Sequence, residues 1–208
     1  MTGADGAAGL PEGEVAGRVV PLWNIANVLT VLRLLLVPLF LVALFAADGQ
    51  DPGWRWVATG VFAVASLTDH LDGGLARRHG LVTDFGKIAD PIADKALTGS
   101  ALVGLSLLGE LSWWVTAVIA VREIGVTLLR FWVIRYGVIP ASWGGKAKTL
   151  TQVLAIGFYL LPLPGTWDWL VHTVMGAAVL LTVVTGLDYL VRALRLRARG
   201  RRAVAEAS

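Results

Sequence analysis

Six apolar stretches dominate this sequence, and each is long enough to be considered as a membrane-spanning segment. They cover about residues 24–46, 54–76, 90–109, 113–136, 147–164 and 167–193. A helix needs roughly 20 apolar residues to cross a bilayer. Backbone polar groups inside a bilayer must be satisfied within the segment, which favours helices. The sequence therefore predicts an all-α, polytopic membrane protein with six transmembrane helices, of which the fifth is the shortest.

Composition supports this prediction and excludes other classes of protein. Hydrophobic residues make up 56% of the 208 residues, and charged residues only 16%, whereas about a quarter of a soluble domain is charged. The net charge is +3, but the basic residues cluster at the ends of apolar stretches. This distribution is typical of membrane proteins and argues against a nucleic-acid partner. The chain has no cysteine, which excludes disulfides and thiolate metal sites.

The connections between the predicted helices alternate in charge. One set is acidic and carries Asp48, Asp51, Glu110 and Asp168. The other set is basic and carries Arg77, Arg78, Lys87, Arg135, Lys146 and Lys148. The positive-inside rule places the basic set, and with it both termini, in the cytosol of a bacterial-type plasma membrane. An outer aromatic belt would then comprise Trp54, Trp113, Trp114, Trp167 and Trp169.

The two ends of the chain differ from its middle. Residues 1–20 are rich in Gly and Ala and lack the features of a signal peptide, which predicts a mobile cytosolic tail. Residues 21–194 form the predicted six-helix catalytic domain. Residues 195–208 form a basic cytosolic tail that either lies at an anionic lipid surface or is simply solvated.

Four aspartates interrupt the apolar pattern. Asp69 and Asp72 are spaced i, i+3, and Asp90 and Asp94 are spaced i, i+4, so each pair shares one helix face. Asp90 precedes Pro91, which predicts a helix N-cap at that position. Carboxylates in a membrane are costly, about 2.5–3.5 kcal/mol each near its centre. A divalent cation resolves this cost, and an all-oxygen ligand set favours Mg²⁺ or Mn²⁺.

Small and basic residues accompany the aspartates. Gly73 and Gly86 would let a ligand or backbone approach closely. Arg77 lies one turn beyond Gly73, where its guanidinium could bind a phosphate. The alternative is a helix-packing glycine and an arginine that reaches out to the membrane edge. That alternative explains each residue singly but does not explain the whole cluster.

Together these residues form the pattern D-x2-D-G-x2-A-R-x8-G-x3-D-x3-D. The sequence matches every fixed position, through Asp69, Asp72, Gly73, Ala76, Arg77, Gly86, Asp90 and Asp94. On this pattern the chain resembles the CDP-alcohol phosphatidyltransferase family. The resemblance implies a six-helix homodimer with a metal-dependent site that faces the cytosol.

The resemblance also implies roles for these residues. Asp69, Asp72 and Asp90 would hold the metal ions, and Asp94 would contact one of them and act as general base for the acceptor hydroxyl. The donor would be CDP-diacylglycerol. Its CDP group would be bound by Asp69, Gly73, Ala76, Arg77 and Gly86.

Within the family, the chain is most similar to phosphatidylglycerophosphate synthases, whose acceptor is glycerol 3-phosphate. Three segments carry this similarity, at residues 24–33, 122–130 and 145–149. A dianionic acceptor needs cations, and the sequence offers Arg122, Arg130, Lys146 and Lys148 for its phosphate. Glu123 adjoins Arg122, and we expect it to point elsewhere on the helix. Arg122 could instead pair with another span, and the two lysines could serve topology alone.

Three other functions compete with this hypothesis. A phosphatidylinositol-phosphate synthase would use the same donor and metal site with a different acceptor. A small cation transporter would use the aspartates as an ion path, but it leaves the fixed spacing of Gly73, Ala76, Arg77 and Gly86 unexplained. A purely structural dimeric membrane protein would not justify the cost of the buried charges.

Overall fold

The structure is a computed structural model that describes residues 24–79, 83–134 and 143–206. Within these ranges, the side chains of residues 26, 69–79, 84–88 and 200–206 are left aside. The described residues form six α-helices and two short 3₁₀ helices, Ala46–Gly49 and Gly165–Trp167, and contain no strand. The α-helices are α1 (Ile25–Phe45), α2 (Pro52–His79), α3 (Asp84–Leu107), α4 (Trp113–Val133), α5 (Trp143–Leu160) and α6 (Asp168–Glu206). The prediction of an all-α protein is confirmed.

Local sequence explains one helix start and misleads at another. The side chain of Asn24 caps α1 by accepting a hydrogen bond of 3.0 Å from the Asn27 backbone N–H, as N-cap asparagines do. The predicted N-cap at Asp90 is wrong, because α3 begins at Asp84 and contains Pro91 in its interior. An interior proline removes only one backbone donor, which helices of membrane proteins commonly tolerate. Asp90 and Asp94 therefore share one face of a continuous helix.

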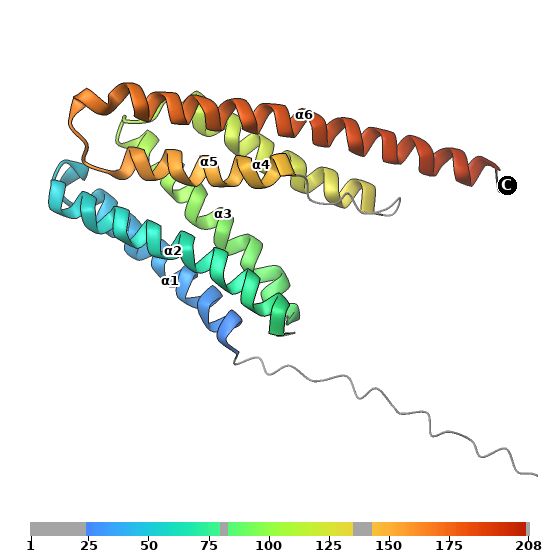
Figure 1. The fold of residues 1–208 in the computed structure, drawn as a ribbon, viewed down its shortest axis with the longest axis horizontal. Helices are drawn as coiled ribbons and strands as arrows, with labels where there is room; N and C mark the ends of the chain where they lie inside the picture. The colour runs from blue at the N-terminus through green and yellow to red at the C-terminus, as the bar shows by residue number, and fades with distance from the viewer. Residues whose placement is uncertain (1–23, 80–82, 135–142, 207–208) are drawn as a thin grey trace, which may run out of the picture.

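The six helices run up and down and form two groups that diverge (Figure 1). One group contains α1 and α2, which lie side by side, and the other contains α4, α5 and α6. Helix α3 contacts both groups, with its N-terminal half on the side of α1 and α2. The groups meet at the end that carries the 3₁₀ helices and separate at the other end. The start of α1 and the end of α6 lie at the open end.

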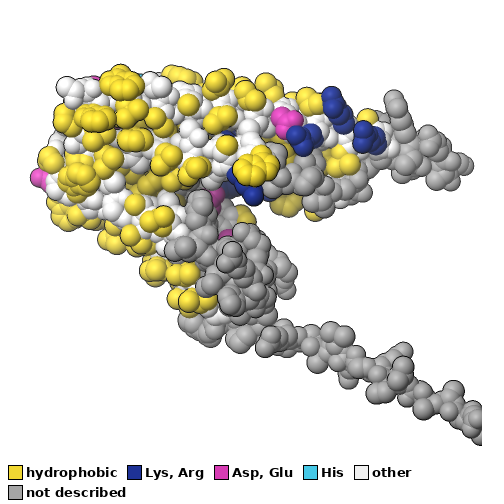
Figure 2. Space-filling model, in the orientation of Figure 1, with side chains coloured by type: hydrophobic (Ala, Val, Ile, Leu, Met, Phe, Trp, Pro, Cys, Tyr) yellow, Lys and Arg dark blue, Asp and Glu magenta, His cyan; other side chains and the backbone are white. Residues whose placement is uncertain are grey.

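The outer surface is covered with large apolar side chains (Figure 2). The exposed fraction reaches 64% for Leu35, 71% for Val121 and 69% for Phe131. A water-soluble monomer rarely exposes continuous apolar surface of this extent. By length and composition, two described segments could cross a membrane, Asn27–Gly49 and Gly165–Arg199. Among the described residues the other four predicted spans do not meet that criterion, and α3, α4 and α5 carry the charged side chains described below.

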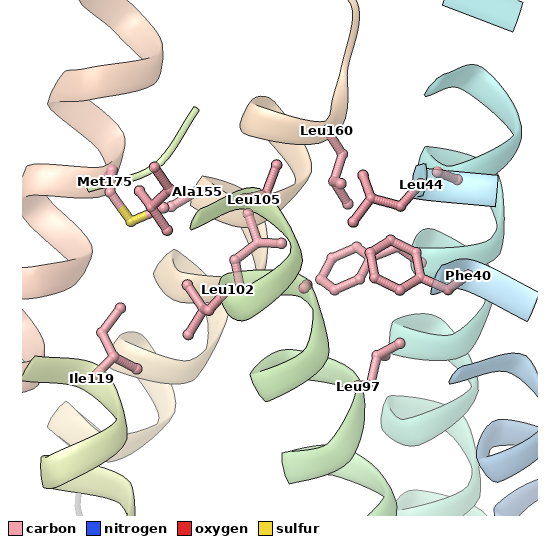
Figure 3. Close-up of a cluster of buried hydrophobic side chains, with 14 of the residues drawn as sticks. Phe40, Leu44, Leu97, Leu102, Leu105, Ile119, Ala155, Leu160 and Met175 are labelled. Carbon is pink, nitrogen blue, oxygen red and sulfur yellow. The ribbon is translucent and has the colours of Figure 1, made fainter. Parts of the chain in front are cut away.

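The buried core lies where the two groups of helices meet (Figure 3). Phe40 and Leu44 of α1 pack there with side chains of α2, α3 and α5, and the rings of Phe40 and Phe62 lie 5.9 Å apart. Met175 brings α6 into the same cluster. Because the core fastens the helices at one end only, the other end is left open for the polar side chains.

The two ends of the molecule differ in chemistry. All five tryptophans of the predicted outer belt are exposed and lie at the closed end. Arg55 of α2 is buried there and pairs with Glu110 at 2.5 Å, and it also donates to the Tyr159 carbonyl at 2.7 Å. Many of the described Lys and Arg side chains lie toward the open end, where Figure 2 shows some of them beside the hollow between the groups and others farther along α6. Trp143, 87% exposed, lies at the open end as well.

Candidate active site

A cavity of about 680 Å³ with many charged lining residues lies between α3 and the group formed by α4, α5 and α6. It opens on the side where the two groups of helices separate, and Figure 2 shows acidic and basic side chains at this hollow. Its charged lining residues are Asp90, Asp94, Lys95, Arg122, Glu123, Arg130, Lys146, Asp188 and Arg192. Such a concentration of charge inside a largely apolar molecule is a strong indication of function.

One wall of the cavity is formed by α3 and carries two of the predicted metal ligands. Asp90 and Asp94 both line the cavity, one helical turn apart. The hydroxyl of Thr30, a fully buried residue of α1, donates a hydrogen bond to Oδ1 of Asp90. This contact joins residues 60 positions apart and fixes the Asp90 carboxylate. A carboxylate has about four acceptor sites, so the hydrogen bond leaves capacity for a metal ion.

The opposite wall is basic and is built by three helices. Arg122 and Arg130 come from α4, Lys146 from α5 and Arg192 from α6. Arg130 Nε donates to the Tyr189 hydroxyl at 3.3 Å, and its guanidinium lies 5.7 Å from the centre of the Tyr189 ring. The Lys146 ammonium lies 5.6 Å from a tryptophan ring of its own helix. Aromatic contacts of this kind orient cations without neutralising them.

A carboxylate lies among these cations. Glu123 Oε1 accepts a hydrogen bond from Arg122 Nη1 at 2.9 Å and another from the ammonium of Lys148 on α5. Arg122 Nη2 also donates to Thr185 of α6 at 3.3 Å. The expectation that Glu123 points away from Arg122 is wrong. Adjacent side chains diverge at the backbone, but the long arginine side chain spans the difference.

Lys148 occupies a different place from the other predicted phosphate ligands. Its side chain is only 5% exposed and lines a smaller, mainly apolar pocket of about 230 Å³ between α3, α4 and α5. Asp94 and Glu123 border both this pocket and the large cavity. The structure thus brings Arg122, Arg130 and Lys146 together at one cavity and places Lys148 behind Glu123.

The remaining predicted site residues lie outside the described side chains. They are Asp69, Asp72, Gly73, Ala76 and Arg77 of α2, and Gly86 of α3. Among the described side chains, no three His, Cys, Asp or Glu residues form a group that could hold a metal ion. The donor set present, the oxygens of Asp90 and Asp94 beside a buried threonine hydroxyl, is hard and suits a cation such as Mg²⁺ or Mn²⁺.

The comparison with protein families decides the assignment. The family model for CDP-alcohol phosphatidyltransferases matches residues 23–184, most of the chain. This chain belongs to the CDP-alcohol phosphatidyltransferase family. The match includes all of α1 to α5 and the start of α6. It therefore covers the cavity residues of α3, α4 and α5 and ends just before Thr185, the first cavity residue of α6.

Relatives of this phosphatidyltransferase carry more specific names. This chain is 58% identical over 186 residues to a probable phosphatidylglycerophosphate synthase of Mycobacterium tuberculosis strain H37Rv. The aligned region covers 89% of this chain and 88% of the relative. The chain is 37% identical over 175 residues to the CDP-diacylglycerol–glycerol-3-phosphate 3-phosphatidyltransferases of Shigella flexneri and Salmonella typhimurium. That match covers 81% of this chain and 93% of each relative.

The three segments that suggested this similarity contribute to the site. Segment 24–33 supplies Thr30, segment 122–130 supplies three charged cavity residues, and segment 145–149 supplies Lys146 and Lys148. Sequence reasoning missed the contribution of α6, namely Thr185, Asp188, Tyr189 and Arg192, because nothing local marks these residues as facing a cavity. Glu123 could have been found, since a carboxylate within a predicted span is itself a signal of function.

Proposed function

We propose that this phosphatidyltransferase transfers the phosphatidyl group of CDP-diacylglycerol to sn-glycerol 3-phosphate, which gives phosphatidylglycerophosphate and CMP. The observation that carries this proposal is the charged lining of the cavity. Its α3 side carries two carboxylates and Lys95, and its α4, α5 and α6 side carries four cations together with Glu123 and Asp188. One wall suits a metal-bound diphosphate, and the other suits an anionic acceptor. The names of the relatives favour glycerol 3-phosphate as that acceptor.

In the proposed reaction, a hydroxyl oxygen of the acceptor attacks the phosphorus that bears diacylglycerol. A new oxygen–phosphorus bond forms, the bond from that phosphorus to the CMP oxygen breaks, and CMP leaves with the electron pair. The acceptor proton passes to the carboxylate of Asp94, which borders the cavity. Most of the rate enhancement is expected from holding the two substrates in line, because an intramolecular geometry removes much of the entropic barrier.

The donor is assigned to the α2 and α3 side of the cavity. Asp69, Asp72, Asp90 and Asp94 are proposed to hold Mg²⁺ or Mn²⁺, which would neutralise charge on the diphosphate. Gly73, Ala76, Arg77 and Gly86, with Asp69, are proposed to bind the CDP group. Thr30 supports this wall, because its hydrogen bond keeps the Asp90 carboxylate in one orientation.

The acceptor phosphate is assigned to the basic wall. Arg122, Arg130 and Lys146 line it directly, and Arg192 of α6 adds a fourth cation. Arg192 is half-exposed and pairs with Asp188 at 2.8 Å, so part of its charge is already compensated. Arg130 has only an uncharged partner, Tyr189, among the contacts described here. We therefore expect Arg130 to contribute more to acceptor binding than Arg192.

The proposal is tested with purified protein, CDP-diacylglycerol and a panel of acceptors. Glycerol 3-phosphate, inositol 1-phosphate, glycerol and inositol are offered separately with Mg²⁺, with Mn²⁺ or with EDTA. We expect CMP release and a phosphatidylglycerophosphate product with glycerol 3-phosphate, and none with EDTA. Preference for inositol phosphate would make the protein a phosphatidylinositol-phosphate synthase. Absence of CMP release with every acceptor would refute the transferase function.

We also propose that all six helices lie in the membrane, with the cavity and both termini on the cytosolic side. The apolar outer surface, the tryptophans at the closed end and the cations at the open end support this orientation. Helix α6 has 39 residues and is about 58 Å long at 1.5 Å per residue. It exceeds a bilayer core of about 30 Å, so its basic C-terminal part extends into the cytosol.

Topology can be tested without background labelling, because the chain has no cysteine. Gln50→Cys and Thr166→Cys, at the closed end, should react with a membrane-impermeant maleimide in intact cells. Ala198→Cys, in the extended part of α6, should react only after permeabilisation. The reverse pattern would invert the orientation.

The cytosolic tails at residues 1–20 and 195–208 stay predictions, and so does the homodimer. Light scattering of the purified protein tests the dimer. The predicted start of the C-terminal tail at residue 195 lies inside helix α6, which is continuous from Asp168 to Glu206.

A further inference from the structure

Glu123 is an unexpected residue in a cavity that we propose to bind an anionic acceptor. Its carboxylate is 27% exposed and lines the large cavity between the basic side chains. A negative charge at this place repels the acceptor phosphate, so on electrostatic grounds alone it lowers affinity. A carboxylate in such a position requires a compensating role.

The contacts of Glu123 indicate that role. One oxygen, Oε1, accepts hydrogen bonds from both Arg122 Nη1 on α4 and Lys148 Nζ on α5. The single oxygen therefore joins two cations that would otherwise repel each other. Charge-assisted hydrogen bonds of this type are among the stronger side-chain interactions in proteins.

The Arg122 side chain is held on three sides. Glu123 binds Nη1, Thr185 of α6 accepts from Nη2 at 3.3 Å, and Gly186 packs against the aliphatic stem. A Cβ added at Gly186 would lie only 3.0 Å from Arg122 Cγ. Glycine at this position therefore allows the α6 backbone to approach the Arg122 side chain closely. Arginine has several rotatable bonds, and fixing them before the ligand arrives reduces the entropic cost of binding.

Lys148 supports this arrangement from behind. Its ammonium is buried, borders the small apolar pocket and contacts Glu123, whereas the large cavity does not include it. A buried cation needs a paired anion, since an uncompensated charge in such surroundings is strongly destabilising. Lys148 and Glu123 therefore neutralise each other, and of these three paired residues Arg122 is the cation that faces the cavity.

We propose that Glu123 is a positioning residue that directs the Arg122 guanidinium toward the acceptor phosphate, with Lys148 as its buried counter-ion. This inference rests on the proposed function for the identity of the acceptor. It assigns Lys148 a supporting role rather than direct contact with phosphate. Glu123 itself transfers no proton and contacts no reacting atom.

The test compares Glu123→Gln with Glu110→Gln. Glu110 is the matched control because it is also a partly buried carboxylate paired with an arginine, Arg55, but at the closed end. Glu123→Gln should raise the KM for glycerol 3-phosphate by about tenfold, the typical effect of losing one charge-assisted contact. The KM for CDP-diacylglycerol should change less than twofold. Glu110→Gln should lower thermal stability and leave both KM values unchanged.

A second variant guards against failure to fold. Glu123→Gln/Lys148→Met removes the carboxylate together with the buried lysine cation, so Lys148 is not left buried without its counter-ion and the net charge of the group is unchanged. The positioning role predicts that the acceptor KM of this variant stays raised, because Arg122 still lacks its partner. Wild-type acceptor KM in the double variant, or equal increases in both KM values in Glu123→Gln, would show a merely structural role and overturn the proposal.

Equilibrium binding of glycerol 3-phosphate, measured by calorimetry without donor, separates this inference from the proposed function. Wild-type binding without turnover would refute the proposed function. Weaker binding by Glu123→Gln in that case would still support the positioning role. Undiminished binding by Glu123→Gln would refute the positioning role even if the wild-type enzyme turns over as proposed.

Discussion

Replacement of Arg130 by alanine tests the acceptor side of the cavity most directly. Arg130 lines the cavity, and its described contacts are both with Tyr189, a hydrogen bond of 3.3 Å and a cation–π distance of 5.7 Å. Neither contact neutralises its charge, so the guanidinium is available to a phosphate. Loss of a charge-assisted hydrogen bond costs about 1.5–3 kcal/mol.

The exposure of Arg130 sets the expected size of the effect. The side chain is exposed to solvent, which screens its interactions and favours the lower end of that range, about 1.5 kcal/mol. Since 1.4 kcal/mol is a factor of ten, we expect the KM for glycerol 3-phosphate to rise about tenfold. The KM for CDP-diacylglycerol should hardly change, because the donor is assigned to the α2 and α3 side.

Steady-state kinetics with each substrate varied in turn measures both constants. Arg195→Ala is the matched control, because Arg195 is an exposed arginine near the same end of the molecule that does not line the cavity. It should leave both constants unchanged. An unaltered acceptor KM in Arg130→Ala, or an equal loss for both substrates, would refute the assignment of the basic wall to the acceptor.

Four further predictions concern the opposite wall and the closed end. Asp90→Asn should abolish transfer and weaken Mn²⁺ binding, measured by calorimetry. Asp94→Asn should also lose transfer but should still bind CDP-diacylglycerol. Residual turnover with a collapsed donor affinity in Asp94→Asn would refute the role of Asp94 as base. Thr30→Val keeps the shape of the side chain but removes the hydrogen bond to Asp90. It should raise both the Mg²⁺ concentration for half-maximal activity and the Mn²⁺ dissociation constant about five- to tenfold. Unchanged values would show that the hydroxyl does not orient the carboxylate. Arg55→Met leaves Glu110 without its partner and should lower the melting temperature by roughly 6 °C or more with both KM values retained; an unchanged melting temperature would contradict this.

The sequence alone was sufficient for the helices and for one wall of the cavity. Helices are built from local hydrogen bonds, so long apolar runs place all six of them to within a few residues at most ends. The i, i+4 spacing likewise sets Asp90 and Asp94 on one face, because helical geometry fixes that relation. The exceptions are the end of α6, which continues to Glu206 and so 13 residues beyond the predicted 193, and the start of α3. An Asp-Pro pair resembles a cap, but the helix begins six residues earlier at Asp84 and continues through Pro91.

Only the tertiary structure decided which charges meet. Thr30 and Asp90 are 60 residues apart, Arg130 and Tyr189 are 59 apart, and the Lys148 contact with Glu123 joins two helices. Such contacts depend on how helices rotate and cross when they pack, and the side-chain pattern of one helix does not determine that rotation. The sequence identified basic residues that could bind a dianion, but not which of them face the same cavity. Packing of α6 against both α4 and α5 determined that Lys148 is buried behind Glu123 while Arg192 faces the cavity.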